Sequence, residues 1–275
     1  MAGQQRARLG QVFLRDSRVE RRIIEELRLR SDDVVLEIGA GPGNMTARLA
    51  ESAAQVVAVE LDPKWAAALR QRFAGKPRPQ SQVQVLEADI LDLSVEDVAR
   101  AAGRERIKVF GNLPYYITSP CLLHLFRYYA AIEEIVVMVQ REVAQRIVAI
   151  PGAGPGSADY GLLSVTCQYY TRPKLLFSIP PEAFRPRPQV HSALVRMTVA
   201  PQKEALGIED EEAFWKWMRA AFAQKRKTLV NNWKGLCEPE RLRAAMESQQ
   251  INVRARAEAL SLAQLAGLHR ALFRG

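Results

Sequence analysis

Short apolar runs alternate with amphipathic segments along the first half of the chain. Runs this short and this continuously apolar predict strands, here at 34–38, 56–60, 83–86, 107–110 and 135–139. Between the runs, apolar residues recur at helical spacing, which predicts helices at 45–53, at 63–73, from Ser94 onward and at 119–129. Near-continuous apolar strands separated by helices are typical of a parallel sheet buried on both faces. The pattern therefore predicts a doubly wound, Rossmann-like α/β domain.

The segments on either side of this pattern complete the predicted architecture. An amphipathic helix is expected at 16–29, and two further strands at 174–178 and 192–199 are expected to finish the sheet. From Asp210 onward the periodicity is helical only. We therefore place a boundary near residue 200, with an α/β domain at 1–200 and a smaller all-helical C-terminal domain at 201–275.

The net charge of the chain indicates which kinds of molecule it binds. The 275 residues carry a formal net charge of +9, which favours contact with phosphate backbones or an anionic membrane surface, although a basic enzyme with a small substrate remains possible. No apolar stretch reaches the ~18–20 residues that span a bilayer, and the basic segment 1–8 does not resemble a secretory signal. We expect no membrane association.

The three cysteines lie far apart in the sequence. Their odd number and wide spacing fit neither a disulfide framework nor a zinc site, so we expect free thiols in a reducing cytoplasm and no bound metal.

A glycine-rich segment follows the first predicted strand. Gly39 and Gly41 begin a G-x-G-x-G spacing, but Asn44 stands where a dinucleotide fingerprint would place another glycine. The second strand ends in Glu60, where a carboxylate accepts hydrogen bonds from ribose hydroxyls. The third leads into Asp89 and Ile90, which suit an adenine amino group and ring. This set favours S-adenosylmethionine over a nicotinamide cofactor.

The tetrapeptide from Asn112 to Tyr115 follows the fourth predicted strand. It combines a carboxamide, a proline and an aromatic ring, which suit the gripping of a planar ring that bears an amine. An ordinary turn followed by a core aromatic is the alternative interpretation of these four residues alone.

With these motifs in place, the chain resembles the ribosomal RNA adenine N6,N6-dimethyltransferases over nearly its whole length. The similar segments are G-Q-x-F-L-x-D at 10–16, N-L-P-Y-x-I at 112–117, Y-G-x-L-S at 160–164, F-x-P-x-P-x-V-x-S at 184–192 and R-K-T-L at 226–229. Val12 departs from the family pattern, which usually has His or Asn there, so a contact at this position would rest on the backbone.

The resemblance implies a class I S-adenosylmethionine-dependent methyltransferase. Its implied reaction is N6,N6-dimethylation of adjacent adenines near the 3′ end of small-subunit rRNA, carried out by a cytoplasmic monomer on the assembling 30S particle. It assigns cofactor binding to Gln11, Val12, Leu14, Gly39, Gly41, Glu60, Asp89, Ile90 and Asn112. In the implied mechanism, the Asn112 side-chain oxygen and the Pro114 carbonyl accept from the adenine amine, while Tyr115 and Phe184 stack on the two faces of the ring.

Basic residues are candidate contacts to RNA phosphates, although a solvated surface charge is the favoured interpretation of any one of them taken alone. The candidates are Arg141, Arg146, Arg185, Arg187, Lys225, Arg226 and Lys227. The apolar stripe within 214–233 is expected to be core of the helical domain, with the run 225–227 at a turn or on its exposed face.

Other functions share some of these features. A large-subunit rRNA adenine methyltransferase of the macrolide-resistance type has the same cofactor and catalytic motifs. A DNA adenine methyltransferase usually carries proline where this chain has Leu113. A non-catalytic ribosome-assembly factor of the same fold is the third alternative, and the intact motif at Asn112 disfavours it.

Overall fold

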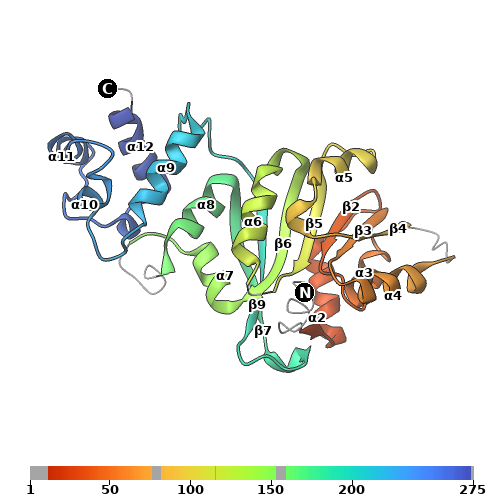
Figure 1. The fold of residues 1–275 in the computed structure, drawn as a ribbon. Coiled ribbons are helices and arrows are strands. Elements are labelled where there is room, and N and C mark those ends of the chain that lie inside the picture. The colour runs from red at the N-terminus through yellow and green to blue at the C-terminus, as the bar shows by residue number, and fades with distance from the viewer. Residues whose placement is uncertain (1–11, 76–81, 115, 153–158, 274–275) are drawn as a thin grey trace, which may run out of the picture. The chain divides into compact units, whose positions relative to one another are not determined.

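The computed structural model describes residues 12–75, 82–114, 116–152 and 159–273 (Figure 1). The chain divides into two compact units. The first spans Met1–Ala144 and Lys174–Val199, and the second spans Gln145–Pro173 and Ala200–Gly275. The second unit resumes at residue 200, next to the predicted boundary, and also includes 145–173, which the sequence analysis assigned to the larger domain.

A seven-stranded sheet forms the centre of the described part of the first unit, in the order β4-β3-β2-β5-β6-β9-β7. The neighbours from β4 to β6 pair in parallel, and β9 joins β6 antiparallel. The predicted α/β domain is therefore confirmed, including every predicted strand. The strands are β2 (Val34–Ile38), β3 (Gln55–Glu60), β4 (Gln82–Glu87), β5 (Ile107–Asn112), β6 (Ile132–Gln140), β7 (Thr171–Ile179) and β9 (Ser192–Val199).

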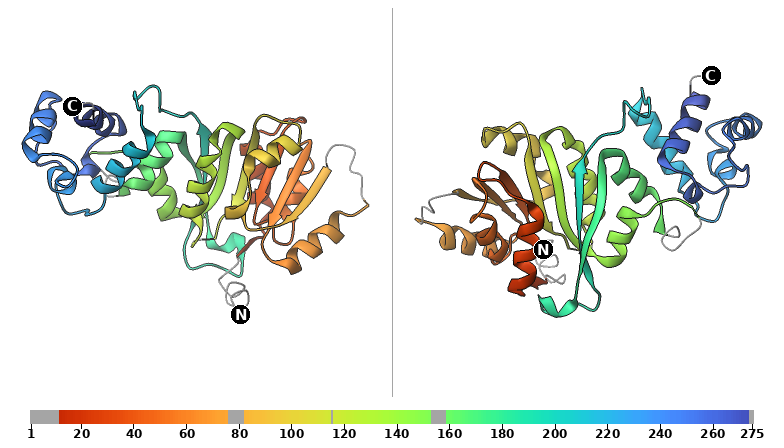
Figure 2. Two further views of the ribbon diagram at one scale, coloured as in Figure 1. Left: turned by 45° about the horizontal axis from the view of Figure 1, so that its top comes forward. Right: turned by 180° about the vertical axis from the view of Figure 1, so that it is seen from behind.

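Helices cover both faces of this sheet, as right-handed crossovers between parallel strands require. On one face, Ile23 and Leu49 share a buried cluster with Val56 of β3. The next residue along β3, Val57, points to the opposite face, where Val98 lies across a groove from it. Figures 1 and 2 show the layers. The helices of these layers are α2 (Ser17–Leu27), α3 (Asn44–Leu49), α4 (Pro63–Phe73), α5 (Val95–Ala101) and α6 (Thr118–Arg127), with the short turns η1 (Ile90–Asp92) and η2 (Tyr129–Ala131).

A two-stranded ribbon joins the N-terminal segment to a distant part of the chain. In it, β1 (Phe13–Leu14) pairs antiparallel with β8 (Phe184–Arg185), which follows the turn η4 (Pro181–Ala183). The backbone N–H groups of Arg15 and Asp16 both donate to the carbonyl of Ala183, at 2.8 and 3.3 Å. The ribbon fixes the chain immediately before α2, whose N-terminus is capped by the Asp16 side chain.

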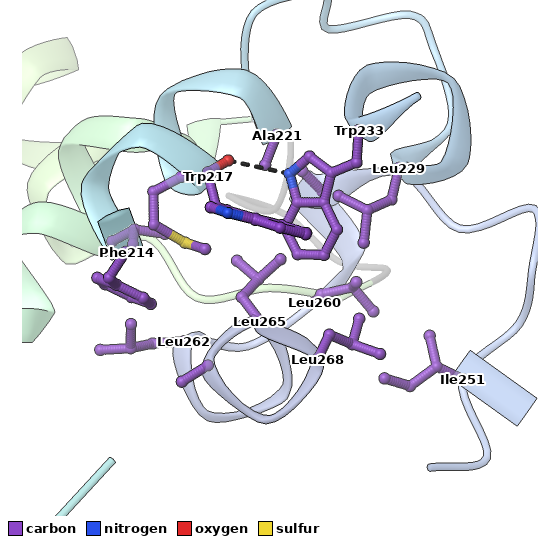
Figure 3. Packing of buried hydrophobic residues seen from close by; sticks show 14 of the residues in the cluster. Phe214, Trp217, Ala221, Leu229, Trp233, Ile251, Leu260, Leu262, Leu265 and Leu268 are labelled. Carbon is purple, nitrogen blue, oxygen red and sulfur yellow. Dashed lines mark hydrogen bonds between the residues drawn. The ribbon is translucent and has the colours of Figure 1, made fainter. Parts of the chain in front are cut away.

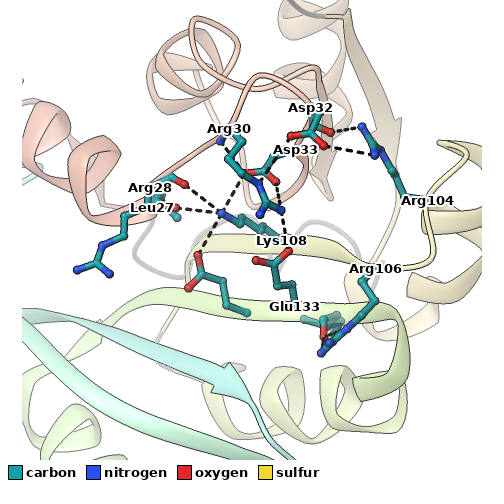
Figure 4. Close-up of polar contacts among 11 residues, drawn as sticks. Leu27, Arg28, Arg30, Asp32, Asp33, Arg104, Arg106, Lys108 and Glu133 are labelled. Atoms are coloured by element: carbon teal, nitrogen blue, oxygen red, sulfur yellow. Dashed lines mark hydrogen bonds and ion pairs between the residues drawn. The ribbon is translucent and has the colours of Figure 1, made fainter.

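A buried ion network holds the amino ends of the central strands (Figure 4). The Lys108 ammonium lies 2.9 Å from a carboxylate oxygen of Asp33 and 3.7 Å from one of Glu134, its neighbour on β6. It also donates to the carbonyls of Leu27 and Arg28 at the end of α2. One cation therefore satisfies groups from three separate elements.

The second unit is built around an aromatic core (Figure 3). The Trp217 and Trp233 rings meet edge to face at 4.8 Å, and the Trp233 indole N–H donates to the Trp217 carbonyl at 2.9 Å. The stripe within 214–233 is therefore core, as predicted. Val165 and Tyr169 belong to the same cluster, which explains why 145–173 groups with this unit. Helix α7 (Arg141–Val148) contains the division between the two units, after Ala144. The other helices of the second unit are α8 (Leu162–Tyr170), α9 (Glu211–Ala221), α10 (Leu229–Trp233), α11 (Pro239–Ser248) and α12 (Leu262–Phe273), with the turn η5 (Ala257–Ala259).

Within the described ranges, every helix is too short or too polar to cross a bilayer.

Removal of the buried ammonium tests the network. We expect Lys108→Met to lower the free energy of unfolding by about 3–5 kcal/mol, because Asp33 loses its buried ion pair and keeps the exposed Arg30, while Glu134 loses one of its two cationic partners, the other being Arg196. Urea denaturation of the purified protein measures the change. Arg30→Ala is the control, because the Arg30 side chain is 64% exposed and its ion pair with Asp33 is worth at most about 1 kcal/mol. Equal losses for the two variants would contradict the structural role of Lys108.

Candidate active site

The strand order of the sheet reverses between β2 and β5, which start separate crossovers in opposite directions. Both strands are parallel, so their carboxyl ends meet at one edge of the sheet. A Cβ atom built on Gly39 would lie 3.8 Å from the backbone oxygen of Asn112. The predicted glycine loop and the predicted catalytic motif are therefore neighbours in space.

The loop after β2 needs its glycines. Gly39, Gly41 and Gly43 have φ angles of +72°, +52° and +80°. A Cβ on Gly41 would lie 2.7 Å from the Phe13 ring, and one on Gly43 would lie 2.6 Å from the Leu69 side chain. Side chains at these two positions would collide with the residues that cover the loop, so the tight turn depends on glycine.

Acidic side chains lie at the carboxyl ends of β3 and β4, as predicted. Glu60 is buried and accepts from the backbone N–H groups of Gly41 at 2.8 Å and Asp62 at 2.9 Å, one on each carboxylate oxygen. Asp89 accepts from the Leu91 N–H at 3.0 Å and starts η1, where Ile90 is buried. Each carboxylate therefore shapes its own loop and keeps lone pairs for a ligand.

A small pocket opens beside the glycine loop. Its lining includes Phe13, Leu14, Glu37, Gly39 and Asn112. Glu37 is buried, and its Oε2 atom has no hydrogen-bond partner among the described residues. Burial raises the pKa of the Glu37 carboxyl to about 8, with a smaller contribution from the Glu60 carboxylate. Glu37 was not among the residues predicted from the sequence, although an acid within an apolar central strand is a usable signal.

The Asn112 side chain lies at the end of β5 with a defined orientation. Its Nδ2 atom donates to the backbone carbonyl of Val12 at 3.0 Å. No donor contacts the Asn112 Oδ1 atom within the part of the chain that the structure describes. The Pro114 carbonyl differs, because it already accepts from the Ile117 N–H at 3.1 Å and the Thr118 hydroxyl at 3.3 Å. Asn112 therefore offers the more accessible acceptor of the two.

Comparison with known proteins agrees with this arrangement. The family model "Ribosomal RNA adenine dimethylase" matches residues 2–272. The chain belongs to the ribosomal RNA adenine dimethylase family. Ribosomal RNA small subunit methyltransferase A of Acidobacterium capsulatum is 45% identical, over 99% of this chain and 93% of the relative. The protein of the same name from Koribacter versatilis is 42% identical, over 98% and 95% respectively.

Solved structures share the fold of this dimethylase family member. The 23S rRNA methyltransferase ErmE has a TM-score of 0.70 and 26% identity, covering 95% of this chain and 99% of its own. A dimethyladenosine transferase from Plasmodium falciparum has a TM-score of 0.73 and 21% identity, covering 93% and 95% respectively, which bears on the fold alone. The class I methyltransferase fold predicted from the sequence is confirmed.

Several residues predicted for the dimethylase site have a clear position. Leu14, Gly39 and Asn112 line the pocket, whereas Gln11 and Tyr115 lie outside the described residues. Phe184 has no exposed surface and is paired with Leu14 across the ribbon. A ring without an open face packs as core in this arrangement, so its stacking on a base stays a prediction.

The predicted phosphate contacts fall on both units of the dimethylase. In the first unit, Arg141 is exposed, Arg185 donates to the Glu182 carbonyl at 3.2 Å, and Arg187 forms an ion pair with the Glu182 carboxylate. In the second unit, Arg146 is exposed on α7, and the run 225–227 is exposed in the turn between α9 and α10, as expected.

The buried Glu37 carboxyl makes stability depend on pH. Its pKa in the folded protein is about 8 against an ordinary 4.5, so the folded state favours the protonated form. The contribution is fully present below about pH 4.5 and is lost as the pH rises through about 8. We expect the urea midpoint of the cofactor-free wild type to fall over this range and that of Glu37→Gln to fall less. If the urea midpoints of the two proteins changed with pH in parallel, the raised pKa of Glu37 would be contradicted.

Proposed function

We propose that this protein transfers methyl groups from S-adenosylmethionine to N6 of adjacent adenines near the 3′ end of small-subunit rRNA. One observation carries the proposal: the Asn112 carboxamide oxygen is presented beside the glycine-loop pocket, at the junction of β2 and β5. The names of the relatives that are 45% and 42% identical support the choice of the small subunit.

The pocket suits the methionine end of S-adenosylmethionine. Its buried Glu37 Oε2 atom lacks a partner among the described residues, which fits the accepting of a hydrogen bond from an ammonium group. Glu60 and Asp89 would hold the ribose and adenine portions, with Ile90 against the ring. Leu14 and the Gln11–Val12 segment would cover the methionine portion. When bound, the cofactor supplies an electrophilic methyl group on a positively charged sulfur.

The protein contributes acceptor geometry rather than a base. The lone pair of an adenine amine is delocalised into the ring, and it is released as the nitrogen becomes tetrahedral. The Asn112 oxygen accepts a hydrogen bond from an N–H group of that amine and stabilises the developing positive charge. Pro114 can add a second acceptor only when the Thr118 hydroxyl turns away from its carbonyl.

A single acceptor suits two successive transfers. An unmodified amine has two N–H bonds and a monomethylated amine has one, so one well-placed oxygen can serve both. This explains how Asn112 can act in each step while the Pro114 carbonyl stays engaged with Ile117 and Thr118.

The substrate must present an unstacked base. Extrusion costs a few kcal/mol, and stacking on an aromatic ring returns about 1–3 kcal/mol per base. We assign one stacking face to Tyr115, and the predicted second face at Phe184 requires that ring to become exposed. The net charge of +9 supplies attraction to the RNA. We place this reaction in the cytoplasm, on the assembling small subunit, with the protein as a monomer.

A large-subunit substrate is the second candidate, favoured by the likeness to the 23S rRNA methyltransferase ErmE. Labelling of both ribosomal subunits with tritiated cofactor, followed by digestion of each rRNA, separates the two functions. Dimethyladenosine confined to large-subunit rRNA would overturn the proposal.

Removal of the proposed acceptor tests the catalytic assignment. We expect Asn112→Ala to lower the methylation rate by several orders of magnitude, while cofactor affinity falls much less, because the oxygen acts mainly in the transition state. Single-turnover methylation of small subunits from cells that lack this protein gives the rate, and calorimetry gives the affinity. A variant with the full wild-type rate would reject the role of Asn112.

The exposed run 225–227 provides a test of RNA contact. We expect the triple variant Lys225→Gln/Arg226→Gln/Lys227→Gln to reduce the slope of log affinity against log salt by about 2, at roughly 0.7 per lost phosphate contact. Filter binding to small-subunit rRNA at several salt concentrations measures the slope. The control Arg241→Gln/Arg243→Gln/Arg254→Gln removes the same charge from exposed positions of the same unit. Equal slopes for both variants would assign the effect to net charge alone.

A further inference from the structure

The orientation of the Asn112 carboxamide depends on a residue 100 positions away in the sequence. Its Nδ2 atom donates to the Val12 carbonyl at 3.0 Å. A carbonyl oxygen can only accept, so the nitrogen of the carboxamide must face Val12. The Oδ1 atom then lies on the other side of the amide group, where it can accept from a ligand.

The Val12 carbonyl is itself held by the segment that follows it. Phe13 and Leu14 form β1, and the Arg15 N–H donates to the Ala183 carbonyl at 2.8 Å. The Phe13 ring lies against Gly41 and meets the Trp65 ring edge to face at 5.3 Å. Pairing and packing therefore fix the backbone immediately after Val12.

We propose that the Val12 backbone carbonyl is a positioning group for the reaction. It selects the orientation of the Asn112 carboxamide in which the oxygen, and not the nitrogen, meets the substrate amine. The opposite orientation would place N–H groups against the amine and could not accept from it. This inference rests on the proposed function, because it assigns the Asn112 oxygen to an adenine amine.

Because this contact uses the backbone, it also explains why position 12 can carry an apolar side chain. The hydrogen bond uses the Val12 carbonyl, which every amino acid provides. The valine side chain is free to pack against the cluster of Leu14 and Ile23. A polar side chain at position 12 is therefore not needed to orient Asn112.

The variant Asn112→Asp separates the two roles of this side chain. One is the hydrogen bond to the Val12 carbonyl, here called the tether, and the other is the oxygen that accepts from the substrate amine. It keeps an oxygen for the amine and nearly the same shape, but an ionised carboxylate cannot donate to Val12. A protonated carboxyl can donate its O–H to Val12 while the other oxygen accepts. The tether is therefore lost at high pH and restored as the introduced group takes up a proton.

Single-turnover methylation at saturating cofactor and RNA is measured from pH 5 to 8. We expect the rate of Asn112→Asp to be at least about tenfold below wild type at pH 8 and the ratio of the two rates to rise as the pH falls, with RNA affinity within about twofold. Asn252→Asp is the matched control, because Asn252 is exposed in the second unit and its Oδ1 atom only accepts, from the Arg254 N–H. Its rate relative to wild type should not change with pH.

Two results would overturn the proposal that the Val12 carbonyl orients Asn112. Wild-type rates for Asn112→Asp at pH 8 would show that an acceptor alone is sufficient. A folded Asn112→Asp protein whose deficit stays constant from pH 8 to 5 would show that restoring a donor has no effect. Both leave the proposed function intact, which fails instead if Asn112→Ala is fully active or if small-subunit rRNA is not methylated.

A second measurement does not require the variant to fold. In protein labelled with ¹⁵N-asparagine and ¹³C-valine, a scalar coupling between the Asn112 Nδ2 atom and the Val12 carbonyl carbon reports the hydrogen bond directly. We expect this coupling together with slowed exchange of the Asn112 side-chain protons. Exchange at the rate of a free asparagine, without coupling, would overturn the proposal.

Discussion

The adjacency of β2 and β5 at the centre of the sheet is the constraint on which the site depends. Because these strands are parallel neighbours whose crossovers leave in opposite directions, their carboxyl ends lie side by side at the point where the strand order reverses, which is where open α/β sheets bind ligands. The Gly39 loop and Asn112 meet there, and two neighbouring residues contact them: Phe13 of β1 lies against Gly41, and the carbonyl of the preceding Val12 accepts from Asn112. Under the proposed function, the methyl donor and the acceptor of the substrate amine lie at neighbouring strand ends, which is the arrangement that a direct transfer requires.

The amino ends of the central strands, at the opposite edge of the sheet, contribute to stability. There Lys108 joins Asp33, Glu134 and the carbonyls of Leu27 and Arg28 at the end of α2, so that one buried cation contacts groups from three separate elements. A buried network of this kind adds little net stability over an apolar core, but it penalises any arrangement that leaves one member unpaired. It therefore favours a single placement of α2 against the sheet. Since β1 directly precedes α2, the network also restricts where the N-terminal segment can lie.

Much of this architecture could be predicted from the sequence, because strands buried on both faces leave apolar runs that are visible in a single chain. The glycine loop and the motif at Asn112 could be predicted because each lies directly after such a run. The ribbon could not, since β1 and β8 are two residues long and pair across about 170 positions. For the same reason Phe184 was expected as an open stacking face, whereas its pairing with Leu14 buries it. Residues 145–173 were assigned to the larger domain because Val165 and Tyr169 give no local sign that they pack with Phe214.

The arginines near β8 show why a basic residue is not by itself a phosphate contact. The Glu182 carbonyl accepts from Arg185, and the Glu182 carboxylate forms an ion pair with Arg187, so both side chains have partners before any RNA arrives. Both are largely exposed, and exposed ion pairs are worth at most about 1 kcal/mol. A phosphate can therefore displace Glu182 at small cost. In the absence of RNA, the ion pair holds Arg187 next to the ribbon of β1 and β8.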